Sequence, residues 1–139
     1  MINRVLDLQA LTVRQAMKPL EQAVTTTAQT PVRAALALGC QRKLTRLPVW
    51  DDREGERRII GLLALNPLLY QAVLDLDKPV NEHVKPALFL DEDMRLEVAL
   101  RRLQRSGQRL AIVLSRERRE IGLLSLQDVL QVIFGEVSL

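Results

Sequence analysis

Residues 57–65 read Arg-Arg-Ile-Ile-Gly-Leu-Leu-Ala-Leu, and residues 118–126 read Arg-Arg-Glu-Ile-Gly-Leu-Leu-Ser-Leu, an offset of 61 positions. Two further pairs of segments recur in the same order along the chain. Residues 47–50 match residues 111–114 at an offset of 64, and residues 13–19 match residues 80–86 at an offset of 67. Three matches in one order indicate an internal duplication, in which the loops of the two copies differ in length.

Copy 1 carries a succession of local patterns that predict short elements. We expect a strand over 22–26, a helix that Thr30 caps, Pro31 begins and Gly39 ends, and two strands over 46–50 and 59–65 around a charged turn. Asn66-Pro67 begins another expected helix, and the apolar residues on one side of that helix are Leu68, Leu69, Ala72 and Val73.

Copy 2 repeats this succession. Its expected strands cover 88–90, 110–114 and 121–124. Its expected helices cover 96–103, ending near Ser106-Gly107, and 127–134, with Ser125 placed to cap the last one. The order β-α-β-β-α therefore occurs twice, which places the chain in the α/β (α+β) class. Neither copy can cover its strands alone, so we expect a core that the two copies share. We expect a linker over 1–11, copy 1 over 12–75 and copy 2 over 76–139.

Composition excludes several classes of protein. The chain has 139 residues, a net charge of +3, and arginines spread among acidic residues rather than gathered in one basic stripe, so we expect no nucleic-acid partner. The single histidine, His83, and the single cysteine, Cys40, lie in different copies, and Cys40 is expected to be a buried structural thiol. Asp91-Glu92-Asp93 precedes a helix, where acidic residues serve the helix dipole. No catalytic residue and no metal ligand is predicted.

A duplicated β-α-β-β-α unit of this size resembles the CBS module, named after cystathionine β-synthase. The segments Met17–Glu21, Thr45–Val49 and Gly122–Asp128 resemble one branch in particular. This branch is the cytoplasmic CBS pair of magnesium and cobalt efflux, haemolysin-like and cyclin-M membrane proteins. The resemblance covers essentially the whole chain. It implies a pseudo-twofold pair with two clefts, homodimers formed through CBS helices, and attachment to a transmembrane domain in an inner or plasma membrane.

The resemblance also implies an adenine nucleotide, ATP or AMP, as the ligand, with any Mg²⁺ arriving on its phosphates. Ser125 is expected to contact phosphate, and Asp128 the ribose hydroxyls. Lys18, where relatives have threonine, is either a phosphate-binding charge or a solvated side chain, and Arg46 is either a phosphate ligand or a surface charge. The nucleotide-binding residues that the resemblance implies are Met17, Lys18, Leu44, Thr45, Arg46, Leu47, Pro48, Ser125 and Asp128.

Two interpretations of Ser125 and Asp128 stay open. They are nucleotide ligands, or they form a capping box in which Asp128 returns a hydrogen bond to the backbone of Ser125. Copy 1 has Ala64 and Pro67 at the corresponding positions, so we expect one nucleotide site per chain or none. The expected function is therefore regulatory nucleotide sensing without catalysis, and the alternative is a ligand-free structural dimerisation module. Apolar residues on the helix of the first copy and on the closing helix exceed what one face can bury internally, and we expect the surplus to form the dimer; these residues are Leu68, Leu69, Val73, Val129, Leu130, Val132 and Ile133.

Overall fold

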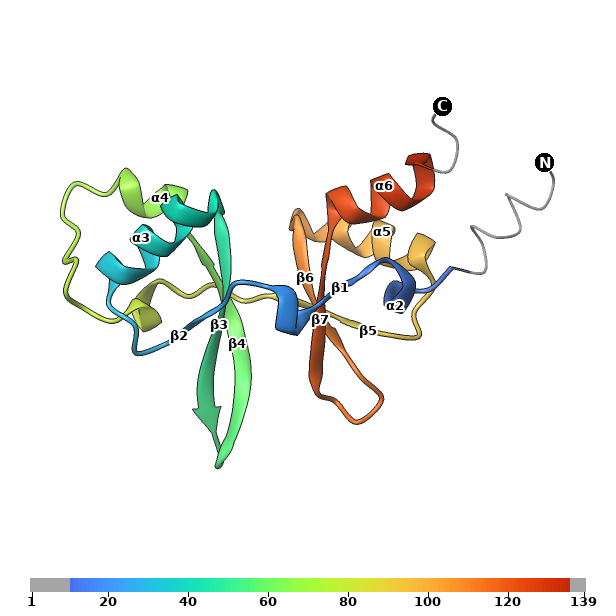
Figure 1. Cartoon of the computed structure of the whole chain (residues 1–139), viewed down its shortest axis with the longest axis horizontal. Coiled ribbons are helices and arrows are strands. Elements are labelled where there is room, and N and C mark those ends of the chain that lie inside the picture. Colours follow the sequence, from blue (N-terminus) through green and yellow to red (C-terminus); the bar gives the residue numbers. More distant parts are fainter. Residues whose placement is uncertain (1–10, 136–139) are drawn as a thin grey trace. The chain divides into compact units, whose positions relative to one another are not determined.

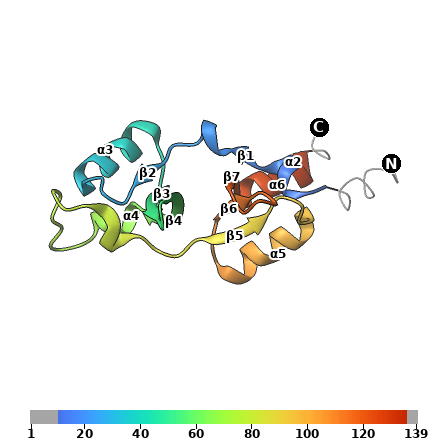
Figure 2. The ribbon, with the colours of Figure 1, turned by 90° about the horizontal axis from the view of Figure 1, so that it is seen from below.

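The computed structural model describes residues 11–135. The predicted linker, apart from Leu11, and the last four residues of copy 2 lie outside them. The chain divides into two compact units, which we call unit 1 and unit 2 (Figures 1 and 2). Unit 2 is the continuous stretch Val24–Pro86, and unit 1 combines the residues up to Ala23 with those from Ala87 onward. Within the described residues no helix has the length and apolar character needed to cross a membrane.

Unit 2 is built on a three-stranded sheet in the order β2-β3-β4. The strands β2 and β3 are parallel, and β3 and β4 form an antiparallel hairpin, which Figure 1 shows as a long ribbon. Glu54 and Gly55, at the hairpin tip, both have positive φ angles, 51° and 81°. The elements of unit 2 are β2 (Thr26–Thr27), α3 (Val32–Arg42), β3 (Arg46–Arg53), β4 (Glu56–Ala64), α4 (Asn66–Leu69) and the 3₁₀ helix η2 (Val80–His83).

Unit 1 is built on a four-stranded sheet in the order β1-β7-β6-β5. Parallel pairing joins β5 to β6, and antiparallel pairing joins β6 to β7 and β7 to β1. The helix α5 packs against α6 and β5. The elements of unit 1 are α2 (Val13–Ala16), β1 (Lys18–Pro19), the 3₁₀ helix η1 (Leu20–Gln22), β5 (Leu88–Asp91), α5 (Leu96–Ser106), β6 (Leu110–Leu114), β7 (Glu120–Ser125) and α6 (Leu126–Gly135).

The duplication seen in the sequence is present in the structure. The helices α3 and α5 begin and end 64 positions apart, and both end at a residue in the left-handed conformation, Lys43 and Gly107. Thr26 pairs with Val49 in unit 2, and in unit 1 the residues 64 positions later, Leu90 and Val113, pair in the same parallel register. The predicted fold class, two β-α-β-β-α repeats, is confirmed.

The copies exchange their first segments. Lys18, from the start of copy 1, pairs with Leu123 in unit 1, whereas Lys85, from the start of copy 2, bridges Leu62 in unit 2. A glycine lies at each of these two contacts. A Cβ on Gly122 would clash with the Met17 sulfur and the Lys18 carbonyl oxygen. A Cβ on Gly61 would clash with the Lys85 carbonyl oxygen. The glycine shared by the two repeated stretches therefore admits the backbone of the other copy.

Each core contains apolar residues from both copies. In unit 1, Val13 of copy 1 is fully buried among residues of copy 2 that include Leu90, Leu103 and Leu124. In unit 2, Val80 of copy 2 is fully buried among residues of copy 1. We expected one core shared by the two copies; the described residues form two cores, one in each unit, and both copies contribute to each of them through the exchanged segments.

Some local predictions were wrong. Pro31 rather than Thr30 is the N-cap of α3, and the Thr30 hydroxyl lies 2.9 Å from the Thr27 hydroxyl instead. The strands of the hairpin continue into the predicted charged turn, so that only two residues separate them. The helix α4 ends at Leu69, which leaves Val73 outside it and 89% exposed. Cys40 is exposed, because Gly39 occupies the buried position next to Leu65.

Candidate functional site

The N-terminus of α6 is organised by two polar side chains. The Asp128 backbone N–H donates to Ser125 Oγ at 2.9 Å, and the Ser125 N–H donates to Asp128 Oδ2 at 3.2 Å. The Leu126 N–H donates to the Arg109 carbonyl oxygen at 2.8 Å. The capping box, one of the two interpretations of this motif, is therefore formed, and it stabilises the start of the helix.

The capping box leaves binding capacity on the same two side chains. Ser125 Oγ accepts a hydrogen bond from the helix, so its own hydroxyl proton can still be donated to an anion. Asp128 uses Oδ2, and among residues 11–135 no hydrogen bond engages its Oδ1. Both side chains are half-buried and held in place by each other. The capping box thus orients a donor and a carboxylate oxygen, and the two interpretations are compatible.

Two more residues of the predicted site, Met17 and Lys18, lie beside β7, the strand that leads into this helix. Lys18 in β1 pairs with Leu123 in β7, two residues before Ser125. The Lys18 side chain is exposed, and Met17 packs against Gly122. The structure therefore brings Met17, Lys18, Ser125 and Asp128 together within unit 1. This group combines an exposed ammonium, a hydroxyl and a carboxylate, which suits a ligand that carries both anionic and hydroxyl groups.

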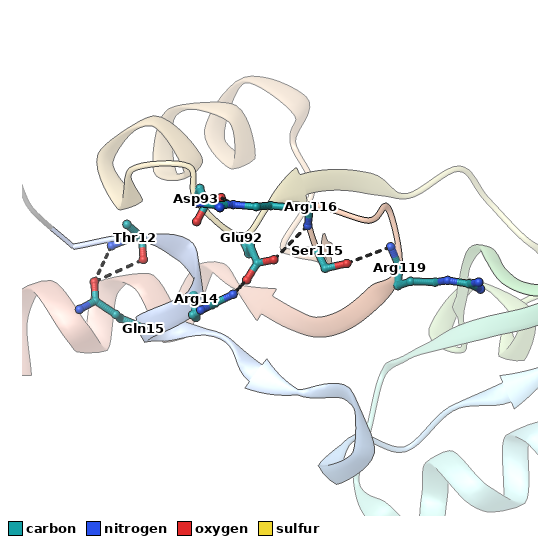
Figure 3. Close-up of polar contacts among 8 residues, drawn as sticks. All are labelled: Thr12, Arg14, Gln15, Glu92, Asp93, Ser115, Arg116 and Arg119. Carbon is teal, nitrogen blue, oxygen red and sulfur yellow. Dashed lines mark hydrogen bonds and ion pairs between the residues drawn. The ribbon is translucent and has the colours of Figure 1, made fainter.

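A buried carboxylate holds the exchanged segment that carries Met17 and Lys18. Glu92 is 3% exposed; its Oε1 is ion-paired with Arg14 of α2, and its Oε2 accepts the Arg116 backbone N–H at 3.0 Å. Figure 3 shows this carboxylate between the two arginines. The backbone adds two bonds, from Val13 N–H to the Met94 carbonyl oxygen at 2.8 Å and from Arg14 N–H to the Glu92 carbonyl oxygen at 3.1 Å.

Sequence reasoning missed this role of Glu92, which we had assigned to the helix dipole. A signal was available, because the duplication aligns Glu92 with Ala28 and Arg14 with Asn81. Neither copy-related position can form the same ion pair. The pair is therefore specific to unit 1, the unit that contains Ser125 and Asp128.

The two acids beside Glu92 are paired with arginines. Asp93 accepts a hydrogen bond from Arg116 Nε at 2.7 Å, and Asp91 accepts one from Arg118 at 2.8 Å. The hydrogen bond to Asp93, together with the charge of that carboxylate, raises the pKa of Arg116. These side chains line a hollow of about 280 Å³ at the end of the sheet opposite Ser125. Within residues 11–135 no group of three or more His, Cys, Asp or Glu side chains is arranged to hold a metal ion.

The other five predicted site residues, Leu44 to Pro48, lie in unit 2. Leu47 is fully buried in the core of that unit and Pro48 is buried, whereas Thr45 and Arg46 are exposed. Arg46 Nη1 donates to Thr45 Oγ1 at 3.3 Å. Leu44 is half-buried, and its N–H donates to the Gly39 carbonyl oxygen at 2.9 Å. Within this stretch the groups available to a ligand are the Thr45 and Arg46 side chains and the partly exposed Leu44.

The start of α4 in unit 2 corresponds to the start of α6 but lacks its polar side chains. The Leu65 N–H donates to the Thr45 carbonyl oxygen at 2.9 Å, as Leu126 does to Arg109 in unit 1. No side chain caps α4, and Ala64 and Pro67 stand where α6 has Ser125 and Asp128. The backbone arrangement is therefore the same at the two helix starts. Of the two, the start of α6 in unit 1 has the hydroxyl donor and the carboxylate, and the start of α4 has neither.

Comparisons with known proteins agree with this architecture. The family model described as "CBS domain" matches residues 80–135. A UPF0053 protein of Mycobacterium tuberculosis is 25% identical over 99% of this chain, and the match covers 32% of that protein. The magnesium and cobalt efflux protein CorC of Vibrio cholerae is 25% identical over 99% of this chain and 47% of its own length. The chain thus spans about a third to a half of the length of these relatives.

Among solved structures, the chain is similar to the CBS domain of a bacterial CNNM/CorC family Mg²⁺ transporter in complex with ATP. The two are 30% identical, with a TM-score of 0.84, over 96% of this chain and 94% of the other. Near-complete coverage of both chains extends the similarity beyond copy 2, which the family model matches, to the whole duplicated fold. The chain therefore belongs to the CBS-domain family.

Proposed function

We propose that the chain is a regulatory CBS pair that senses an adenine nucleotide, ATP or AMP, as the cytoplasmic part of a membrane protein that transports magnesium or cobalt. The observation that carries the proposal is the paired arrangement of Ser125 and Asp128 at the start of α6, next to Met17 and Lys18. The similar CBS domain named above was solved with ATP, and one relative is named for magnesium and cobalt efflux. The proposal includes no catalytic step.

The proposed ligand contacts follow from the groups that remain available. The Ser125 hydroxyl donates to a phosphate oxygen, and the Lys18 ammonium adds an attractive charge. Asp128 Oδ1 accepts hydrogen bonds from the ribose hydroxyls. Leu44 offers an apolar surface to the base, and Arg46 offers a second cation to the phosphates. Any Mg²⁺ arrives on the nucleotide phosphates.

Regulation follows from differential binding of the nucleotide to two conformations of the chain. A ligand that binds one conformation more tightly than the other raises the population of that conformation. In the proposed function this change of population reaches an attached transport domain. The size of the change is limited by the difference between the ligand's affinities for the two conformations.

Calorimetric titration tests the proposal. The purified chain is titrated with ATP, ADP, AMP and S-adenosylmethionine, each with and without Mg²⁺. We expect at least one adenine nucleotide to bind, and we expect binding to raise the melting temperature, because a ligand of the native state stabilises that state. The Ser125→Ala variant should bind more weakly. If no adenine compound binds at millimolar concentration, the nucleotide proposal is wrong.

A second candidate is a structural dimerisation module without a ligand. It is favoured by large apolar side chains that are exposed in the structure: Leu69, Tyr70, Val73, Leu130 and Phe134. A second copy of the chain, bound through the α4 and α6 regions, would cover such side chains. A homodimer is compatible with nucleotide sensing as well. The titration therefore distinguishes the two candidates, and the oligomeric state alone does not.

A further inference from the structure

The outer side of α5 carries a group of exposed arginines. Arg95 is the N-cap residue, and Arg101, Arg102 and Arg105 follow in the helix. We call these four residues the arginine stripe. At about 100° per residue the three helical arginines fall within an arc of about 100°. The buried residues of α5, Leu96, Ala99 and Leu103, lie on the other side, against the core of unit 1.

The arginine stripe lacks carboxylate partners. None of its four guanidinium groups forms an ion pair within residues 11–135, although Glu97 precedes Arg101 by one helical turn. The segment 95–109 holds five arginines and one glutamate, whereas the rest of described unit 1 holds five basic and seven acidic residues. Positive charge in this unit is therefore concentrated on α5.

The copy-related helix shows that the fold does not require these arginines. The helix α3 occupies the same position in unit 2, and 64 positions before the stripe it has Pro31, Ala37, Leu38 and Gln41. Since the two helices pack on equivalent sheets, packing does not explain the arginines of α5.

We propose that the arginine stripe binds the anionic headgroups of a phospholipid bilayer. Guanidinium groups form paired hydrogen bonds with phosphate oxygens, and basic side chains near an anionic leaflet gain attraction within a Debye length of it. The exposed residues of the whole segment 95–109 include no aromatic or aliphatic side chain, whereas protein interfaces have apolar centres and single-stranded nucleic acids are bound by stacking on aromatic rings. Headgroup phosphates are the partner that this chemistry fits.

This inference rests on the proposed attachment to a membrane domain. A tethered domain meets the bilayer at a high effective concentration, so individually weak charge contacts suffice. The same stripe on an untethered protein would bind vesicles more weakly, and salt would suppress that binding, because exposed charges are screened. Contact between α5 and the membrane would then hold unit 1 near the bilayer.

Vesicle co-sedimentation at low ionic strength tests the inference. The chain is mixed with vesicles of phosphatidylcholine alone and with vesicles of phosphatidylcholine and phosphatidylglycerol in equal parts. We expect binding only to the anionic vesicles, and loss of that binding as salt rises. The variant with Arg95→Gln, Arg101→Gln, Arg102→Gln and Arg105→Gln should lose at least about tenfold in affinity, since each basic residue near the surface contributes separately.

A matched variant removes four exposed basic residues of unit 2: Arg33→Gln, Arg42→Gln, Lys43→Gln and Lys78→Gln. It has the same net charge as the stripe variant and should keep most of the binding. Replacing the four stripe arginines with lysine should also keep most of it, which guards against misfolding as the cause of a loss. Equal loss in both glutamine variants, no binding by the wild type, or equal binding to neutral vesicles would overturn the inference.

Nucleotide titration of the stripe variant separates this inference from the proposed function. The stripe variant should bind nucleotide as the wild type does, because none of its four substitutions touches Ser125, Asp128 or Lys18. If the wild type binds anionic vesicles but no nucleotide, the sensing proposal fails and the membrane contact stands. If it binds nucleotide but no vesicle, the membrane contact fails and sensing stands.

Discussion

Arg14, from the start of copy 1, is ion-paired with Glu92, a residue of copy 2 that is 3% exposed. The pair joins two parts of the chain that are far apart in sequence, and it fixes the segment that leads to Met17 and Lys18. The Glu92 side chain is 4% exposed, whereas the Arg14 side chain is 63% exposed. The carboxylate is therefore the member of the pair that depends on its partner, because water cannot replace the arginine around it.

Removing Arg14 should destabilise unit 1. The Arg14→Met variant keeps much of the side-chain volume but leaves the Glu92 charge with the Arg116 N–H alone. We expect the free energy of unfolding to fall by about 1–3 kcal/mol, the cost of an unsatisfied buried group. Chemical denaturation measures it. The matched control is Arg33→Met, because Arg33 is 64% exposed and pairs with Asp77, which is 84% exposed. That change should cost less than about 1 kcal/mol; equal losses would show that burial of Glu92 does not matter.

Alanine in place of Gly61 or Gly122, the glycines at which the exchanged segments contact the sheets, should destabilise the protein to different degrees. At Gly61 the new Cβ meets the Lys85 carbonyl oxygen, which accepts the Leu62 N–H at 2.9 Å, while the Lys85 N–H donates to the Leu62 carbonyl oxygen at 2.9 Å. At Gly122 the nearest atom is the sulfur of Met17, a flexible side chain, although the Lys18 carbonyl is also close. We expect Gly61→Ala to cost about 2–3 kcal/mol and Gly122→Ala about 1–2 kcal/mol. Thermal unfolding of both variants gives the order, and a larger effect at Gly122 would contradict this account.

Asparagine at position 128 should separate capping from ligand binding. The Asp128→Asn side chain keeps an oxygen that can accept the Ser125 N–H, so stability should change by less than about 0.5 kcal/mol. It loses the charge and the second acceptor oxygen that the ribose hydroxyls need. Nucleotide affinity should fall by about tenfold to a hundredfold, since hydrogen bonds to charged groups contribute about 1.5–3 kcal/mol. Calorimetry and denaturation on the same preparation decide it: unchanged affinity would leave Asp128 with a capping role alone.

Nucleotide should bind with a stoichiometry near one per chain. Unit 2 has Ala64 and Pro67 in place of the hydroxyl and the carboxylate, and losing both contacts weakens binding by roughly two to four decades. Calorimetry gives the stoichiometry directly. The double variant Ala64→Ser, Pro67→Asp restores the two side chains at the start of α4 and serves as a gain-of-function comparison. Two sites of similar affinity in the wild type would show that backbone groups suffice for binding.

The chain should form a homodimer through its exposed apolar side chains. Tyr70 and Val73 are 87% and 89% exposed, and Leu69 is 63% exposed, so a second copy has a substantial apolar surface to cover. Sedimentation at tens of micromolar should give about 32 kDa, twice the chain mass of 15.8 kDa. Tyr70→Asp with Val73→Asp should shift the species toward the single-chain mass. A single-chain mass for the wild type at every concentration would contradict the prediction.

The sequence predicted what depends on local pattern. The strand over Leu110–Leu114 and the end of α5 at Gly107 agree with the structure, because a short apolar run and a left-handed glycine act within a few residues. The repeat offsets of 61, 64 and 67 predicted which elements correspond. The capping role of Ser125 was also anticipated, since a hydroxyl three residues before a carboxylate at a helix start has few other local uses.

Long-range contacts were beyond the reach of local pattern. Periodicity shows that residues 13–19 carry an apolar face, but it does not show which sheet the segment joins, so the exchange between copies and the Arg14–Glu92 pair were missed. Cys40 was placed in the core because its neighbours are apolar. In α3 the position that faces Leu65 is Gly39, and that close approach depends on tertiary packing. The grouping of site residues into two units was missed for the same reason.

The exchange of first segments sets an order for folding during synthesis. Unit 2 is one continuous stretch, Val24–Pro86, so all of its residues leave the ribosome while copy 2 is still being made. Lys18 pairs with Leu123, 105 positions later, so β1 waits for nearly the whole chain before it gains a partner. Until then Val13 and its neighbours are exposed apolar residues on a nascent chain, the kind of segment that chaperones protect. Unit 2 therefore folds early, and unit 1 closes only when the second half of the chain has emerged.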